Sequence, residues 1–222
     1  MPSRPQNPPN KKKPAAKANT KPPAKPPAKP PAKSPAKPPA KPPPTPAPPA
    51  PPAPPAKPLI GTLRFVLTPE AETSPVRQRI VDGMNAAIEM YNQNAPFDGE
   101  IAVHYDSGVP TAEASGNRIT FGGMTGYRVS LHEIAHVMGI GLHGAWWSPQ
   151  CRDCDAMVWT GPRGVATLWA FDGPNAVLHA DTLHFWNYGL NNDSELTPGA
   201  DVRHVACVWA MVQDMKAVNP NS

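Results

Sequence analysis

Two histidines and a glutamate lie within five consecutive residues, in the order His132-Glu133-Ile134-Ala135-His136. On a helix, positions i and i+4 share one face, so both imidazoles can bind one metal ion. Zinc accepts imidazole nitrogens, and in catalytic sites it has three protein ligands and a water. Glu133 can then take a proton from that water as it attacks a carbonyl carbon. The motif therefore predicts a hydrolytic zinc centre with His132 and His136 as ligands and Glu133 as the general base.

Uncharged residues surround this motif, as a helix buried behind a metal site requires. They are Val129, Leu131, Ile134, Ala135, Val137 and Met138. Two histidines and a glutamate would otherwise be costly on so apolar a helix. We therefore expect a helix from Tyr127 to Gly139 that carries the three polar side chains.

The elements expected before this helix are strands and one long amphipathic helix. Alternating apolar residues predict strands near 63–67, 101–105 and 118–121. Apolar residues at helical spacing between the first two strands predict a helix of four or five turns; they are Ile80, Met84, Ile88 and Tyr91.

The part after the motif is predicted to be mostly irregular and then helical. Residues 140–190 are rich in Gly, Pro and Trp. A last helix is expected to begin near Thr197-Pro198, a good N-cap followed by proline. Its expected inner face is Val202, Val205, Trp209 and Val212. The fold class predicted for residues 59–222 is α+β, with a small mixed sheet, the metal helix and a C-terminal helix.

At this point the sequence resembles the zincin metallopeptidases. Gly139 lies three residues after His136, as in the metzincin pattern HExxHxxGxxH, but Leu142 stands where that pattern has its third histidine and His143 follows it. A narrower resemblance covers nearly all of 59–222, to poorly characterised microbial metallopeptidases that are sometimes joined to ricin-type lectin repeats. It rests on DGMNAAIEMYNQNAPFDGEIAVHYDSGVPTA, LHEIAHVMGIG, VWTGP and HADTLHFWNYGLNNDSE. The resemblance implies a zincin-like fold, zinc as the cofactor and His184 as a metal ligand.

The third ligand remains open between His184 and His143. Large aromatic neighbours can hold the His184 imidazole rigidly, whereas His143 has nearly the metzincin spacing and Gly141 can absorb one extra residue. Glu195 is a weaker alternative of the kind found in glutamate-ligand zincins. Tyr188 is a candidate catalytic residue, because tyrosines donate to the substrate oxyanion in several zincins.

Other residues are interpreted mainly as structural. Met157 is expected in the core rather than beneath the metal, and His104 and His204 are expected to be structural. His179 could support His184. Cys151, Cys154 and Cys207 are too few for a disulfide framework and are either free thiols or include one pair.

The first 58 residues have a separate character. They hold 25 of the 34 prolines, 12 of the 21 basic residues and none of the 17 acidic ones, so their formal charge is +12 and that of 59–222 is −8. A KPPA repeat excludes helix and sheet and predicts a disordered, extended tail. The tail is either a solvated spacer or a contact with a polyanion such as nucleic acid, an anionic envelope polymer or a lipid surface.

The compartment and the number of subunits are left open. No apolar signal region follows Met1, and no apolar run approaches the roughly 20 residues that span a bilayer. The family resemblance implies secretion, and the cytoplasm is the alternative.

The function predicted from these patterns is that of a zinc-dependent peptidase, an endopeptidase acting on protein or peptide substrates. Hydrolysis of a non-peptide amide would use the same residues. A different class of function is a non-catalytic zincin-fold binding protein that the basic tail attaches to a polyanion.

Overall fold

Residues 59–220 are described by the computed structural model, and they form a mixed α and β protein, as predicted. The predicted tail, residues 1–58, lies outside the described residues. The helices are α1 (Pro69–Glu72), α2 (Arg77–Asn94), α3 (Tyr127–Val137), α4 (Pro162–Asp172) and α5 (Ala200–Val218), with short 3-10 helices η1 (Gly144–Trp147) and η2 (Asp193–Glu195). The strands are β1 (Thr62–Leu67), β2 (Asp98–Tyr105), β3 (Ala112–Ser115), β4 (Arg118–Phe121), β5 (Arg152–Asp153), β6 (Val158–Trp159), β7 (His179–Ala180) and β8 (Phe185–Trp186).

The larger sheet is mixed, in the order β1-β2-β4-β3. Strands β1 and β2 are parallel because α1 and α2 cross between them, and β4 is parallel to β2. Strand β3 is antiparallel to β4 and joined to it by a two-residue turn at Gly116-Asn117, where Gly116 has a φ of +58°. A left-handed residue at this position suits a tight hairpin turn. Strand β3 is therefore an edge strand of the sheet.

Helix α2 packs one apolar face into the core. Ile80, Met84, Ala87 and Tyr91 are fully buried and recur at spacings of four and three, which is the helical period. Gly83 lies on the same helix, and a Cβ there would meet the backbone of Gly126 at 2.7 Å. Glycine thus permits a close approach between α2 and the start of α3.

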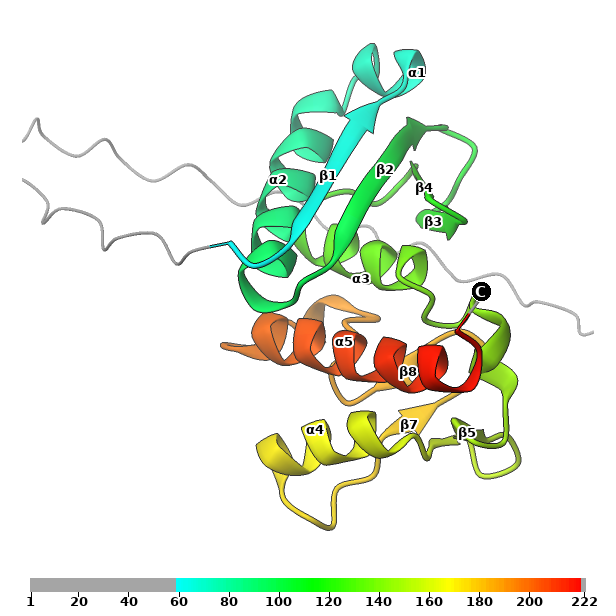
Figure 1. The fold of residues 1–222 in the computed structure, drawn as a ribbon. Coiled ribbons are helices and arrows are strands. Elements are labelled where there is room, and N and C mark those ends of the chain that lie inside the picture. The colour runs from blue at the N-terminus through cyan, green and yellow to red at the C-terminus, as the bar shows by residue number, and fades with distance from the viewer. Residues whose placement is uncertain (1–58, 221–222) are drawn as a thin grey trace, which may run out of the picture. The chain divides into compact units, whose positions relative to one another are not determined.

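Helix α3 runs between the sheet and α5 (Figure 1). Its apolar residues Val129, Leu131, Ile134 and Ala135 are buried. The helix ends at Val137, two residues before the predicted end, and Gly139 follows with a φ of +114°. A glycine with positive φ just after a helix is a common way to end it.

Helices α5 and α4 and a sheet of two-residue strands, β5-β6-β7-β8, form the other side of the protein (Figure 1). Asp214 of α5 is 2% exposed and accepts the backbone N–H groups of Arg163 and Gly164 at 3.0 and 2.9 Å. It also accepts from Trp159 Nε1 at 3.2 Å. A carboxylate on α5 thereby binds the N–H groups at the beginning of α4.

Three parts of the predicted secondary structure were wrong. Residues 140–190 contain the helix α4 and the small sheet rather than a mostly irregular chain. Helix α4 buries only Gly164 and Leu168, so its apolar period is weak in the sequence. Helix α5 begins at Ala200 rather than near Thr197-Pro198, and its expected inner residue Val202 is 42% exposed.

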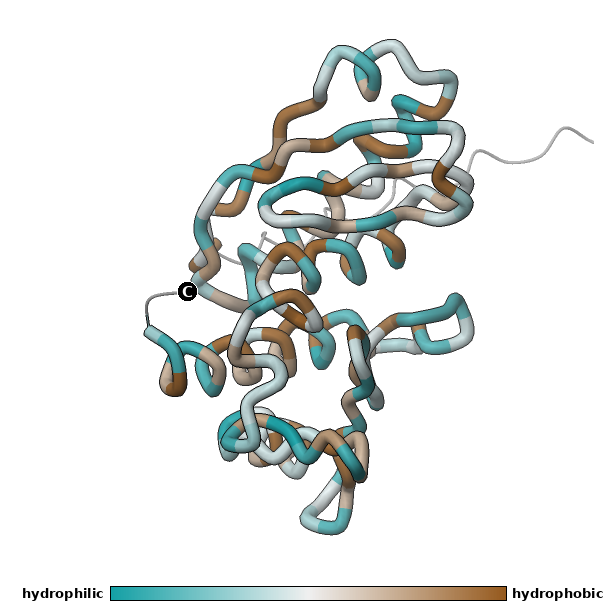
Figure 2. Tube along the Cα trace, turned by 90° about the vertical axis from the view of Figure 1, so that its right-hand side faces the viewer, coloured by the Kyte–Doolittle hydropathy of each residue, from teal (hydrophilic) through white to brown (hydrophobic). Residues whose placement is uncertain are grey.

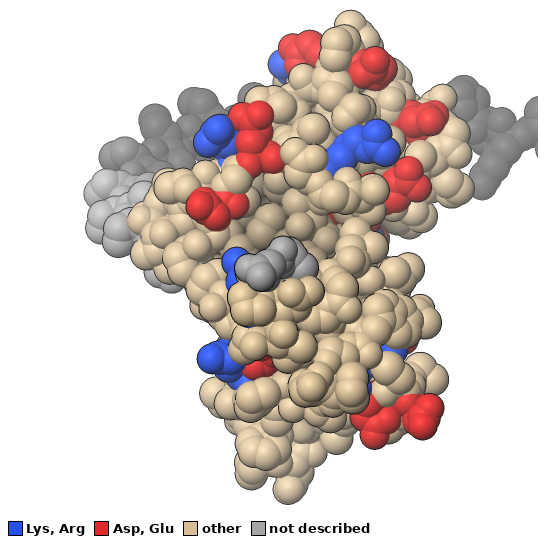
Figure 3. Space-filling view, turned by 45° about the vertical axis from the view of Figure 1, so that its right-hand side comes forward, with Lys and Arg blue, Asp and Glu red and all other residues tan. Residues whose placement is uncertain are grey.

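Hydrophobic and hydrophilic residues alternate along the helices, as Figure 2 shows. On the face drawn in Figure 3, acidic and basic side chains are interspersed, without a continuous patch of either sign. Among residues 59–220, no helix is both long enough and apolar enough to cross a bilayer.

Candidate metal centre

Helix α3 presents His132 and His136 one turn apart, with their Nε2 atoms separated by 3.2 Å. The other nitrogen of each ring faces a backbone carbonyl. His132 Nδ1 lies 2.8 Å from the oxygen of Gly189, and His136 Nδ1 lies 2.8 Å from the oxygen of Ile140. A carbonyl oxygen only accepts hydrogen bonds, so both Nδ1 atoms carry a proton and donate it.

This proton arrangement leaves two Nε2 lone pairs facing each other. Burial, together with the neighbouring His136, lowers the pKa of His132 to about 3, and burial also lowers the pKa of His136. Both rings are therefore neutral near pH 7, and two unprotonated nitrogens 3.2 Å apart repel each other unless they share a cation. Two imidazole ligands of tetrahedral zinc have nitrogens about 3.3 Å apart. The pair has the spacing and the proton positions that a zinc ion requires.

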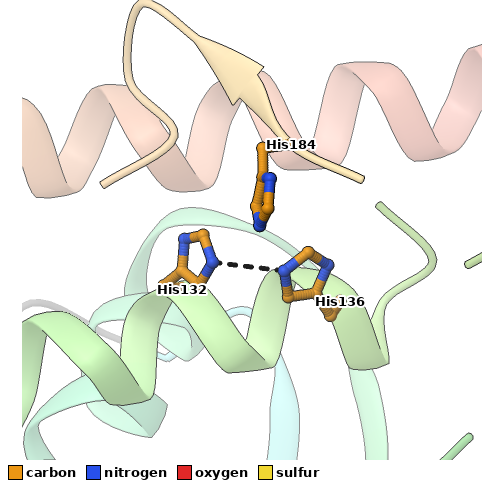
Figure 4. A group of neighbouring side chains, drawn as sticks. All are labelled: His132, His136 and His184. Carbon is orange, nitrogen blue, oxygen red and sulfur yellow. Dashed lines mark hydrogen bonds between the residues drawn. The ribbon is translucent and has the colours of Figure 1, made fainter. Parts of the chain in front are cut away.

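His184 joins this pair from the segment before β8. The three histidines offer nitrogen atoms that all lie within 4.8 Å of one another. The His184 ring centroid is 5.4 Å from each of the other two, and a ring nitrogen points between them (Figure 4). Asp181 holds the segment in place, because its Oδ1 accepts the backbone N–H of His184 at 2.7 Å and lies 3.6 Å from His184 Nδ1. A carboxylate beside the far nitrogen is common for metal-binding histidines.

The two competing ligands lie outside this group. His143 Nδ1 accepts the backbone N–H of Ala145 at 3.0 Å and so caps η1. The Glu195 carboxylate accepts the backbone N–H of Asn191 at 3.0 Å and the side-chain amide of Asn192 at 2.6 Å. Of the three candidates, His184 is the one that the fold brings to His132 and His136.

Glu133 and the three histidines line one cavity of about 290 Å³. Glu133 is 6% exposed, and this burial raises the pKa of its carboxyl to about 7; Arg128 opposes the rise and Glu113 adds to it. A carboxyl group whose pKa lies near the working pH can both accept and return a proton. Residues of β3 form another wall, and Met124, Leu142 and Leu183 add exposed apolar side chains to the cavity.

Arg128 also lines the cavity, although the motif did not indicate it. Its side chain is 10% exposed; Nε donates to Asp193 at 2.6 Å and Nη1 donates to the carbonyl of Leu190 at 2.7 Å. Leu190 is buried with a φ of +56°, a left-handed conformation that costs roughly 1–2 kcal/mol for a residue with a side chain. Arg128 precedes His132 by one helical turn, so its position on the same face could have been read from the spacing.

Tyr188, the predicted oxyanion donor, is not among the residues that line this cavity. Its hydroxyl donates to Asp172 at 2.6 Å and accepts from Arg203 Nη1. The side chain therefore points into an ion-pair cluster between α4 and α5. These contacts do not support the expectation that the hydroxyl faces a substrate.

Met157, His179 and His104 are not among the residues that line the cavity. Met157 is 55% exposed rather than in the core, with a φ of +52°. His179 is exposed on β7, and His104 is half-buried on β2.

All three cysteines are free thiols, and burial raises the pKa of Cys151 and Cys207 to about 11 and 12. These two thiols are therefore protonated and unreactive near neutral pH.

Comparison of the chain with protein-family models, curated proteins and solved structures finds no match in any of the three. The resemblance to zincins therefore rests on the motifs quoted above.

Proposed function

We propose that residues 59–222 are a zinc-dependent peptidase, with His132, His136 and His184 as the metal ligands. The observation that carries the proposal is the convergence of three imidazoles and one buried carboxyl group on a single cavity. Bound zinc would supply Lewis-acid chemistry and lower the pKa of its water toward roughly 7. The Gly189 and Ile140 carbonyls fix the proton on Nδ1 of the two helix histidines, which keeps Nε2 available.

Glu133 is proposed to move the proton. Its carboxylate accepts one proton from the attacking water and returns it to the leaving amine nitrogen. Burial raises the pKa of the group to about 7, so near neutral pH it can both accept and return a proton. Arg128, at the same cavity, balances the negative charge of Glu133.

The cavity walls favour a peptide over another amide. Strand β3 is an edge strand, and its residues Ala112, Glu113 and Ala114 line the cavity. An edge strand has unpaired backbone groups with which an extended peptide can pair. The exposed side chains of Leu142 and Leu183 give an apolar substrate side chain a place to pack.

The test uses the full chain, loaded with zinc, and an unfolded protein together with quenched-fluorescence peptides as substrates. We expect chelator-sensitive cleavage and one zinc per chain. Glu133→Gln should keep the zinc and lose about 10²- to 10⁴-fold in rate, the contribution typical of general acid–base catalysis. Glu89→Gln removes an exposed carboxylate of α2 and serves as the matched control. Full activity of Glu133→Gln, or no cleavage by the zinc-loaded protein, would overturn the proposal.

A further inference from the structure

His204 is a fully buried histidine of α5 that contacts three other parts of the protein. Its Nδ1 lies 2.6 Å from the carbonyl oxygen of Tyr188. Its Nε2 lies 3.0 Å from the hydroxyl of Tyr91 on α2 and 3.1 Å from the carbonyl oxygen of Leu131 on α3. One imidazole thus lies between α2, α3 and the segment that carries His184.

The contacts fix the position of its proton. The carbonyls of Tyr188 and Leu131 can both only accept, but the Tyr188 contact is the shorter, at 2.6 Å against 3.1 Å, so Nδ1 is the donor. Burial lowers the pKa of His204 to about 4, which leaves the ring neutral at pH 7, with Nε2 unprotonated. The Tyr91 hydroxyl lies 3.0 Å from Nε2 and 3.1 Å from the Leu131 carbonyl oxygen, so its one proton is shared between these two acceptors when Nε2 is unprotonated.

His204 contacts two residues of the 184–189 segment, Tyr188 and Phe185, and each is next to a residue of the candidate metal centre. Tyr188 precedes Gly189, whose carbonyl accepts from His132 Nδ1 at 2.8 Å. The ring of Phe185, which follows His184, stacks on the His204 ring with centroids 5.8 Å apart and planes inclined by 21°. His204 therefore contacts Phe185, next to the third proposed ligand, and Tyr188, next to the glycine whose carbonyl orients His132.

We propose that His204 is a positioning residue for the metal centre. Its Nδ1–H holds the Tyr188 carbonyl, which places Gly189 and His184 against the rings of α3. The inference rests on the proposed metal site but not on the identity of the substrate. If His204 only filled space in the core, it would contribute packing to stability. Zinc affinity would then not depend on which ring nitrogen carries the N–H group.

Two variants separate these roles, because the side-chain amide of each replaces a different nitrogen of the imidazole. In His204→Asn the amide nitrogen takes the place of Nδ1 and can still donate to the Tyr188 carbonyl. In His204→Gln the amide takes the place of Nε2, near Tyr91 and Leu131, and the bond to Tyr188 is lost. Both variants lose the ring and its stacking on Phe185, so their losses in metal-free stability should be similar.

The experiment measures zinc affinity of the full chain by competition with a chromophoric chelator, and thermal unfolding of the metal-free protein. Removing a group that orients a metal ligand typically weakens metal binding by about 10- to 100-fold, so we expect about tenfold for His204→Gln and at most about threefold for His204→Asn. His179→Gln changes an exposed histidine and should alter neither quantity.

Equal zinc affinity in the Asn and Gln variants would overturn the inference while leaving the proposed function intact. Failure of the wild-type chain to bind zinc would overturn both. If neither variant folds, Tyr91→Phe decides the question, because it removes only the hydroxyl that contacts Nε2 and the Leu131 carbonyl and leaves the His204 ring in place. We expect about three- to tenfold weaker zinc binding in Tyr91→Phe, and unchanged binding would again overturn the inference.

Discussion

The Nδ1 atom of His132 donates to the carbonyl oxygen of Gly189 at 2.8 Å, across 57 residues of sequence. This bond selects the tautomer in which Nε2 is free, so the first histidine of the motif depends on a backbone group far from it. The segment that provides this carbonyl also provides His184. Helix α3 and the 184–189 segment are therefore linked by a hydrogen bond at the site of the three histidines.

Separate removal of the two competing histidines should show which one is the third ligand of the proposed zinc site. His184→Ala loses one of three nitrogens in the cluster and should weaken zinc binding by about 100-fold or more. His143→Ala loses a cap of η1 and should retain one zinc per chain with a small loss of stability. Metal analysis after dialysis measures both, and loss of zinc from His143→Ala alone would contradict the assignment.

Tyr188→Phe tests the predicted oxyanion role directly. In this structure the hydroxyl binds Asp172 and Arg203, so its removal should leave the rate of peptide cleavage within about threefold. Loss of one oxyanion donor typically costs about 10²- to 10³-fold in kcat. A drop of that size with zinc content unchanged would restore Tyr188 as a catalytic residue.

The sequence predicted the parts of the site that are encoded by side-chain type and local spacing. His132, Glu133 and His136 share one helix, and His184 was favoured by the resemblance and by the large aromatic side chains beside it. The Gly189 and Ile140 carbonyls could not be predicted, because a backbone acceptor leaves no mark on residue type. Tyr188 was chosen because tyrosines donate to the substrate oxyanion in several zincins, but the Tyr188 side chain turns toward Asp172 instead. Helix α4 was missed because only Gly164 and Leu168 of it are buried, so its sequence shows little apolar periodicity.

Gly141→Ala should weaken zinc binding although Gly141 is not a proposed metal ligand. Gly141 has a φ of +74°, and a Cβ there would lie 2.3 Å from the carbonyl oxygen of Leu183, the residue before His184. The clash must move one of the two loops, so we expect both lower stability and weaker zinc binding. Gly144→Ala is the matched control, because a Cβ at Gly144 meets nothing within 4 Å. Zinc affinity is measured by chelator competition, and wild-type affinity in Gly141→Ala would contradict the prediction.

Asp214→Ala should destabilise the protein without changing the ligand set. The substitution leaves the N–H groups of Arg163, Gly164 and Trp159 without their acceptor in a buried place. Such a loss costs about 3 kcal/mol in the free energy of unfolding. Urea unfolding measures it, with the exposed Asp155→Ala as a control expected to change stability by less than about 0.5 kcal/mol. A similar small change in both variants would show that the carboxylate is dispensable.

His204 should make stability depend on pH. Its pKa is lowered by burial from 6.5 to about 4, so the unfolded chain binds more protons than the folded one between these values. The stabilisation is fully present above pH 6.5 and is lost as the pH falls toward 4, by on the order of 3 kcal/mol. Urea unfolding of metal-free wild type and His204→Asn at several pH values isolates this contribution, since the other buried groups are common to both. Parallel pH profiles would contradict it.

The division of the proposed ligand set between α3 and a later segment also has a consequence for synthesis. His132 and His136 leave the ribosome first, and at roughly 5–20 residues per second His184 follows several seconds later. Until then a growing chain has two imidazoles but neither the third nor the carbonyl of Gly189 that orients the first. On the proposed function, hydrolysis begins only after both stretches have been translated and have folded together, which protects the nascent chain and its neighbours from premature cleavage.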